Sequence, residues 1–330
     1  MGPVTVMDLF SVFESKANQL FWQAIDSAHV DSSRPQTVIE PGQAYFSVRL
    51  CEMYLASARK LWRQVYPTVH CYVSTGGSET HTLASPAQFI QLGDANLDRI
   101  ANLNIHLSGP TPYNGEAVTL MAGLYSIPGH DAAKALIEIV GTLAALDPVA
   151  VGQAVSLSKL VKAGVESILG LDQAALHLGI RDSFTPSANP LTSGCFAGIA
   201  APESSIDASQ LWVSHGHLLQ GKTAASAVAY NAHDYMLIAI DRIDAREDWQ
   251  QLRDLQDARA KLTNIVADTQ FSVTEKRTRL AALWPSFIQA LGDSPNLTVP
   301  DRERIASLIS DELLKKLKLQ QEGNPFLKAA

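Results

Sequence analysis

The sequence predicts an α+β fold, in which a β-sandwich-like central domain with inserted helices is flanked by N-terminal helices and a C-terminal helical region. Short apolar runs with alternating side chains, separated by Gly, Pro and Asn, occupy residues 67 to 241 at irregular spacing. Helical spacing precedes and follows them, and charge density rises sharply at Asp241. Because strands and helices do not alternate regularly, a doubly wound parallel sheet is disfavoured.

These changes of pattern divide the chain into three parts. Residues 1 to 66 form the predicted N-terminal helical segment, 67 to 241 the β-rich core domain and 242 to 330 the C-terminal helical region. With 330 residues the chain can bury a sizeable core in one large or two ordinary domains.

Two stretches of the N-terminal segment have helical spacing. Over residues 7 to 29, apolar side chains form one stripe, which predicts a helix that packs on a core or binds a partner. The predicted interaction residues on this stripe are Phe10, Phe13, Leu20 and Phe21. Residues 45 to 65 begin with strand-like alternation and shift to helical spacing, so we expect them to be mostly helix.

The centre of the predicted sandwich is a pair of strands over residues 103 to 107 and 117 to 125. Both faces of the second strand are apolar or small, as in a strand covered on both sides. Asn114-Gly115 lies between the strands, and Asn-Gly supplies the positive φ of a tight turn, so we expect antiparallel pairing. Asp131 can cap the first inserted helix.

The rest of the chain continues this pattern. The second inserted helix begins at Ser156 and ends at a glycine cap, Gly170. Strands or hairpins are then predicted over residues 176 to 180, 194 to 200, 211 to 219 and 235 to 240. The last of these is apolar on both faces, and three helical pieces follow it.

Composition restricts the classes of partner and compartment. The formal net charge of −7 argues against broad, unspecific binding of nucleic acid. The cysteines Cys51, Cys71 and Cys195 are widely spaced and form no CxxC motif, which indicates a reduced, cytoplasmic location. The sequence shows no secretory signal and no apolar run long enough for an integral membrane segment. No motif indicates a cofactor.

The most suggestive cluster for a metal ion comprises His215 and His217, with His233 and Asp234 downstream. Histidines at i and i+2 on a strand point to one face and could share a metal ion. The favoured interpretation is different: Ser-His-Gly is a natural hairpin turn, which would place the histidines at an exposed tip.

Nucleophilic catalysis needs a Ser or Cys activated by a base that a third group orients. The weak candidates are Cys71, beside His70, and Ser78, in the sequence Gly-Gly-Ser-Glu-Thr. Ser78 does not lie in a GxSxG motif, and Cys71 lies in an apolar alternation that is typical of a core thiol.

The sequence therefore favours a non-enzymatic interaction or assembly subunit of an intracellular protein complex, whose partner is another protein or a second copy of the chain. The surplus of amphipathic helix at both ends supports this hypothesis. The alternatives are a hydrolase with a Cys or Ser nucleophile, or a small-ligand or metal-binding domain that uses residues 214 to 217 and 233 to 234.

Overall fold

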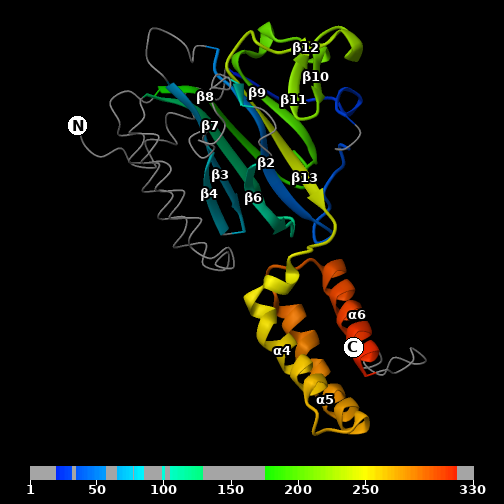
Figure 1. Cartoon of the computed structure of the whole chain (residues 1–330). Helices are drawn as coiled ribbons and strands as arrows, with labels where there is room; N and C mark the ends of the chain where they lie inside the picture. The colour runs from blue at the N-terminus through cyan, green and yellow to red at the C-terminus, as the bar shows by residue number, and fades with distance from the viewer. Residues whose placement is uncertain are drawn as a thin grey trace. The chain divides into compact units, whose positions relative to one another are not determined.

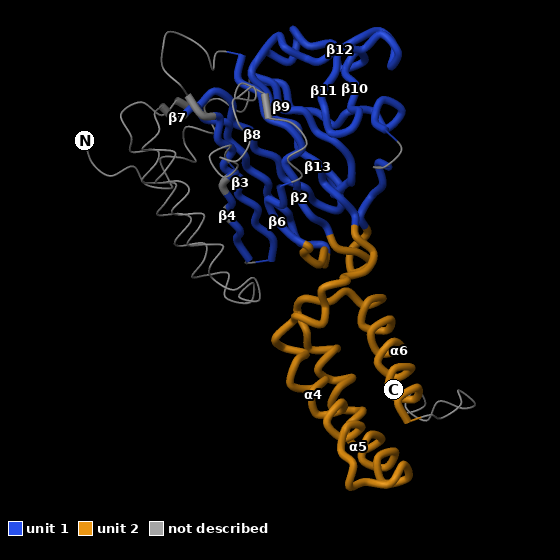
Figure 2. The backbone as a smooth tube through the Cα atoms, viewed as in Figure 1, with its two compact units in different colours: residues 1–39, 46–109, 115–242 blue, residues 40–45, 110–114, 243–330 orange. Residues whose placement is uncertain are grey.

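A computed structural model describes residues 20–31, 35–56, 65–76, 78–84, 99–100, 105–128 and 175–317 of the chain. The chain forms two compact units, which we call the β unit and the helical unit (Figure 2). The β unit takes residues 1–39, 46–109 and 115–242, and the helical unit takes residues 40–45, 110–114 and 243–330.

Three antiparallel sheets pack together in the β unit (Figure 1). The six-stranded sheet has the order β1 (Leu20–Ala24), β9 (Gly194–Pro202), β13 (Tyr235–Ile243), β2 (Tyr45–Tyr54) and β5 (Arg99–Ile100), with β6 (Ile105–Pro112) also paired to β2. The four-stranded sheet has the order β4 (Ser78–Ala84), β3 (Val65–Thr75), β7 (Val118–Pro128) and β8 (Ala175–Phe184). The three-stranded sheet consists of β10 (Leu211–Ser214), β11 (His217–Gln220) and β12 (Val228–Ala229). Short 3-10 helices span Ser27–His29, Glu203–Ser205, Ala208–Gln210, Ala224–Ser226 and Trp249–Gln251.

Both faces of the six-stranded sheet are covered. On one face, alternate residues of β9 and β13 share an apolar core with β10 and β11. That core includes Cys195, Ala197, Leu211, Val213, Leu218, Tyr235 and Leu237. On the other face, Gly198 of β9 lies close to Leu178 and Ile180 of β8. A Cβ added to this glycine would be 3.3 Å from side-chain atoms of both residues. Successive side chains of a strand point to opposite faces, and residues 235–240 are all buried, which confirms the prediction of a strand covered on both sides.

The helical predictions for the N-terminal segment are wrong for most of the described residues, of which only Ser27–His29 forms a short 3-10 helix. Residues 20–24 form β1, and the first ten residues of the stretch from 45 to 65 form β2. The strand that begins at Tyr45 continues through Tyr54 and is buried on both faces, and its pairing with β13 decides against a helix. Tertiary burial of this kind overrides a helical preference that depends on local spacing alone. Residues 1–19, 32–34 and 57–64 of this segment lie outside the described residues.

The predicted pairing of the two central strands is also wrong, because β6 joins the six-stranded sheet and β7 the four-stranded one. Gly109 explains the position of β6: it has φ +93°, and a Cβ there would lie 2.5 Å from the carbonyl oxygen of Phe46 in β2. Gly115 does adopt the positive φ expected after Asn114, at 94°. The turn therefore carries the chain from one sheet to another and does not close a hairpin. The inserted helices predicted between Asp131 and Gly170 lie outside the described residues.

The three predicted C-terminal helices are confirmed as α4 (Arg253–Ala267), α5 (Val273–Asp293) and α6 (Val299–Lys316). Ser272 and Glu275 form a capping box at the start of α5, so that two N-terminal backbone N–H groups are satisfied. The helices share an apolar core of their own, in which Trp284 and Phe287 are each 1% exposed. No helix among the described residues is long and apolar enough to span a membrane.

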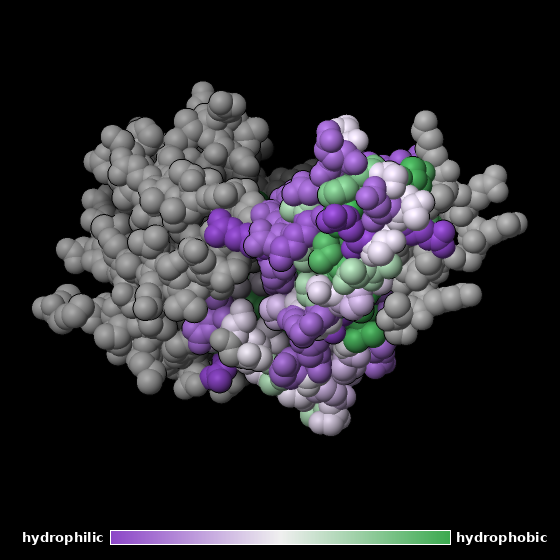
Figure 3. Space-filling view, turned by 90° about the horizontal axis from the view of Figure 1, so that it is seen from below, coloured by the Kyte–Doolittle hydropathy of each residue, from purple (hydrophilic) through white to green (hydrophobic). Residues whose placement is uncertain are grey.

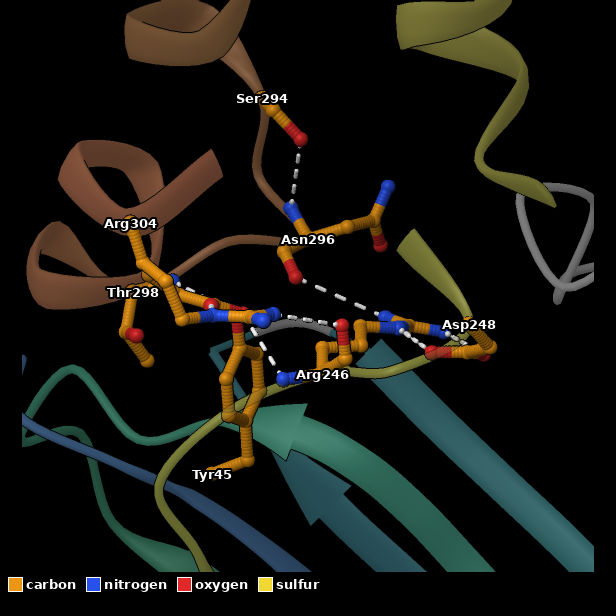
Figure 4. A network of polar contacts seen from close by, with 8 residues as sticks. Tyr45, Arg246, Asp248, Ser294, Asn296, Thr298 and Arg304 are labelled. Carbon is orange, nitrogen blue, oxygen red and sulfur yellow. Dashed lines mark hydrogen bonds and ion pairs between the residues drawn. The ribbon is translucent and has the colours of Figure 1, made fainter. Parts of the chain in front are cut away.

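Tyr45, Arg246 and Arg304, labelled in Figure 4, surround a buried carboxylate in the first turn of α6. Asp301 is 1% exposed and accepts hydrogen bonds from the Tyr45 hydroxyl at 2.7 Å, the Arg246 backbone N–H at 2.9 Å and Arg304 Nε at 2.5 Å. The Arg246 guanidinium makes two hydrogen bonds to Asp248, at 2.6 and 3.0 Å. Burial raises the pKa of Tyr45 to about 12, so its hydroxyl remains a donor. The helix N-terminus also favours negative charge at Asp301.

Candidate active site: a serine, histidine and aspartate cluster

Three polar side chains from distant parts of the β unit form one hydrogen-bonded chain. Ser126 lies in β7, His177 in β8, and Asp234 immediately before β13. His177 Nε2 lies 2.8 Å from Ser126 Oγ, and His177 Nδ1 lies 2.7 Å from Asp234 Oδ2. The imidazole therefore contacts the hydroxyl through one nitrogen and the carboxylate through the other.

A β-bulge accounts for the position of His177. Leu124 of β7 pairs with Leu178, whereas the next residue, Tyr125, pairs with Leu176. His177 is thus the extra residue of β8, with no register partner on β7. In an unbroken strand His177 and Leu178 would point to opposite faces of the sheet. A bulge breaks this alternation and re-aims one side chain, here toward Asp234 beside the neighbouring sheet.

Asp234 is held from several sides. Its Oδ1 atom accepts a 2.6 Å hydrogen bond from the backbone N–H of Ala56, and its backbone carbonyl accepts one from Ala200 at 2.9 Å. Burial alone would raise the pKa of the carboxyl. The hydrogen bonds from His177 and Ala56, with the charges of His177 and His233, outweigh burial and lower that pKa. Asp234 is therefore an ionised acceptor at neutral pH.

This geometry determines what each atom can do. An ionised Asp234 only accepts hydrogen bonds, so the proton on the imidazole belongs on Nδ1. Nε2 then carries a lone pair that accepts the Ser126 hydroxyl proton. A hydroxyl, an imidazole and a carboxylate are thus joined in the order in which a base, oriented by a third group, can activate a serine. The side chains of His177 and Asp234 are 21% and 15% exposed, so the base is partly open to solvent.

The predicted nucleophiles lie elsewhere. Cys71 lies in β3 and is 0% exposed; burial raises the pKa of its thiol, so the reactive thiolate is disfavoured. Ser78 is the exposed first residue of β4, and its register partner across the β3–β4 hairpin is Thr75. Neither residue belongs to the cluster. No local motif in the sequence marks Ser126 or His177, and Asp234 was predicted only as a potential metal ligand.

The three predicted metal-ligand histidines have different surroundings. His215 and Gly216, with φ of 52° and 80°, form the turn between β10 and β11, as the hairpin interpretation predicts. His217 Nδ1 lies 3.3 Å from Glu52 Oε1, and His233 Nδ1 lies 2.7 Å from the Tyr230 hydroxyl. Within the part of the chain that the structure describes, His, Cys, Asp and Glu form no group of three or more that could hold a metal ion.

Two of the four predicted interaction residues lie among the residues that the structure describes. Leu20 is partly buried in β1, and Phe21, also in β1, is 1% exposed within the core that β10 and β11 share. Phe21 thus packs inside the β unit. Phe10 and Phe13 lie outside the described residues.

Comparison with known proteins leaves the chain without an assigned family. No protein-family model matches the sequence, and no curated protein matches it. We therefore infer the function from the geometry of the site.

Proposed function

We propose that the β unit is a hydrolase that uses Ser126 as nucleophile, His177 as general base and acid, and Asp234 as the group that orients the imidazole. The observation that supports this proposal is the continuous chain of hydrogen bonds through both imidazole nitrogens. The hydrolase alternative from the sequence is thereby retained, with a different nucleophile from the predicted Cys71 or Ser78.

The reaction class is acyl transfer from a carboxylic ester or amide to water. Ser126 Oγ attacks the carbonyl carbon while its proton passes to His177 Nε2. The tetrahedral intermediate collapses, the C–O or C–N bond breaks, and the imidazolium returns the proton to the leaving group. Water then attacks the acyl-serine, again with His177 as base, and releases the acid. Asp234 keeps the proton on Nδ1 throughout.

Labelling with a fluorophosphonate tests this proposal, because such probes react with serines that a neighbouring base activates. We expect one adduct per chain, which peptide mass spectrometry places on Ser126. Ser126→Ala should remove the adduct, whereas Ser78→Ala and Cys71→Ala should retain it. A cluster with a purely structural role gives the opposite result: no adduct on Ser126 in the folded wild-type protein.

A second candidate is the assembly subunit that the sequence favours. Its support is the helical unit, which has a core of its own and contains none of Ser126, His177 and Asp234. Among the large exposed apolar residues are Val273, Val299 and Leu308 of this unit, at 49%, 53% and 46%. On the face that Figure 3 shows, hydrophilic and hydrophobic residues are interspersed. The partner in such an assembly would be another protein or a second copy of the chain.

Light scattering of the purified chain over a concentration series tests the assembly role. We expect a mass above that of one chain, which falls on dilution as mass action requires. A monomer at every concentration, together with no recovered partner in pull-down experiments, would reject this second candidate and leave the hydrolase proposal unaffected.

A further inference from the structure

The structure holds the Asp234 carboxylate through both of its oxygens. Oδ2 contacts His177, and Oδ1 accepts the backbone N–H of Ala56 at 2.6 Å. The main chain of Asp234 is fixed separately, through the hydrogen bond that its carbonyl accepts from Ala200 in β9. Rotation about the side-chain bonds remains, and the N–H of Ala56 opposes the rotation that would take Oδ2 away from the imidazole.

The position of this N–H depends on how β2 ends. Ala56 comes two residues after Tyr54, the last residue of β2, and β2 pairs with β13, whose first residue follows Asp234. The rings of Tyr54 and Tyr235 lie 5.5 Å apart, which ties the end of β2 to the start of β13. The donor and its carboxylate are thus set by two adjacent strands of one sheet.

We infer that the backbone N–H of Ala56 is a positioning group for the Ser126 site, which keeps the Asp234 carboxylate aligned with His177. This inference depends on the proposed hydrolase function. Ala56 acts here through its backbone, because its methyl side chain has no polar group.

The test removes the N–H and keeps the side chain small. Proline lacks a backbone N–H, whereas glycine retains it, so Ala56→Pro and Ala56→Gly form a matched pair. Hydrogen bonds to charged groups contribute enough that we expect fluorophosphonate to label Ser126 about 10- to 100-fold more slowly in Ala56→Pro than in Ala56→Gly. If the proline variant fails to fold, replacing Ala56 by lactic acid substitutes an ester oxygen for the N–H without a ring.

A spectroscopic readout distinguishes positioning from general loosening of the fold. The proton on His177 Nδ1, hydrogen-bonded to Asp234, should give a low-field NMR resonance in the wild-type protein. That resonance should be absent in Asp234→Asn and shifted in the variants without the N–H. If Ser126 is labelled in the wild type, but equally fast in the two Ala56 variants and with an unchanged resonance, this inference alone is overturned. If the wild-type Ser126 is not labelled, the proposed function fails, and the inference with it.

Discussion

Ser126→Ala and His177→Ala are each expected to lower kcat/KM for a chromogenic ester by a factor of about 10³ or more, and the double variant to lower it little further. The hydroxyl and the imidazole act as one unit, joined by the 2.8 Å contact between Oγ and Nε2. Without the base the hydroxyl keeps its proton, and without the hydroxyl the base has no nucleophile to activate. Steady-state kinetics of the three variants measure this non-additivity.

The control for these variants is His106→Ala, since His106 is an exposed histidine of β6. It should hydrolyse the ester at the wild-type rate, and circular dichroism should show the same fold in all variants.

Asp234→Asn gives a complementary result: an amide that donates to Nδ1 places the imidazole proton on Nε2, which then cannot accept from Ser126. Independent, additive effects of Ser126→Ala and His177→Ala would contradict the shared role.

Asp301→Ala is expected to destabilise the helical unit by about 3 kcal/mol, because each buried donor left without its acceptor costs about 1 to 3 kcal/mol. The variant leaves three donors without their acceptor: the Tyr45 hydroxyl, the Arg246 backbone N–H and Arg304 Nε. It also removes the negative charge from the first turn of α6, where the helix dipole favours it. Urea unfolding followed by circular dichroism measures the change in free energy.

Asp311→Ala is the matched control, because Asp311 is an exposed aspartate of the same helix. Surface substitutions of this kind stay within about 0.5 kcal/mol. Asp301→Asn removes the charge but keeps the shape of the side chain and one acceptor oxygen. We therefore expect it to lower the free energy of unfolding by less than Asp301→Ala does. Equal unfolding free energies for Asp301→Ala and Asp311→Ala would show that the network contributes nothing to stability.

Local patterns determined much of the fold. The continuous apolar run from Tyr235 to Ile240 predicts a strand covered on both faces, and the Ser-His-Gly segment before His217 predicts a hairpin turn. The three C-terminal helices follow from apolar residues at helical spacing within a charged region. Each of these features depends on residues within one element or one turn, so the physical signal is contained in neighbouring positions.

The tertiary structure decided everything that depends on which elements meet. The strand at 45–54 and the separation of β6 from β7 follow from pairing partners that no local spacing specifies. The candidate site depends on such contacts most of all. Ser126 and His177 lie 51 positions apart, and His177 and Asp234 lie 57 apart. Only the packing of two sheets, and a one-residue bulge that turns the imidazole across the space between them, brings these three ordinary polar residues into one hydrogen-bonded chain.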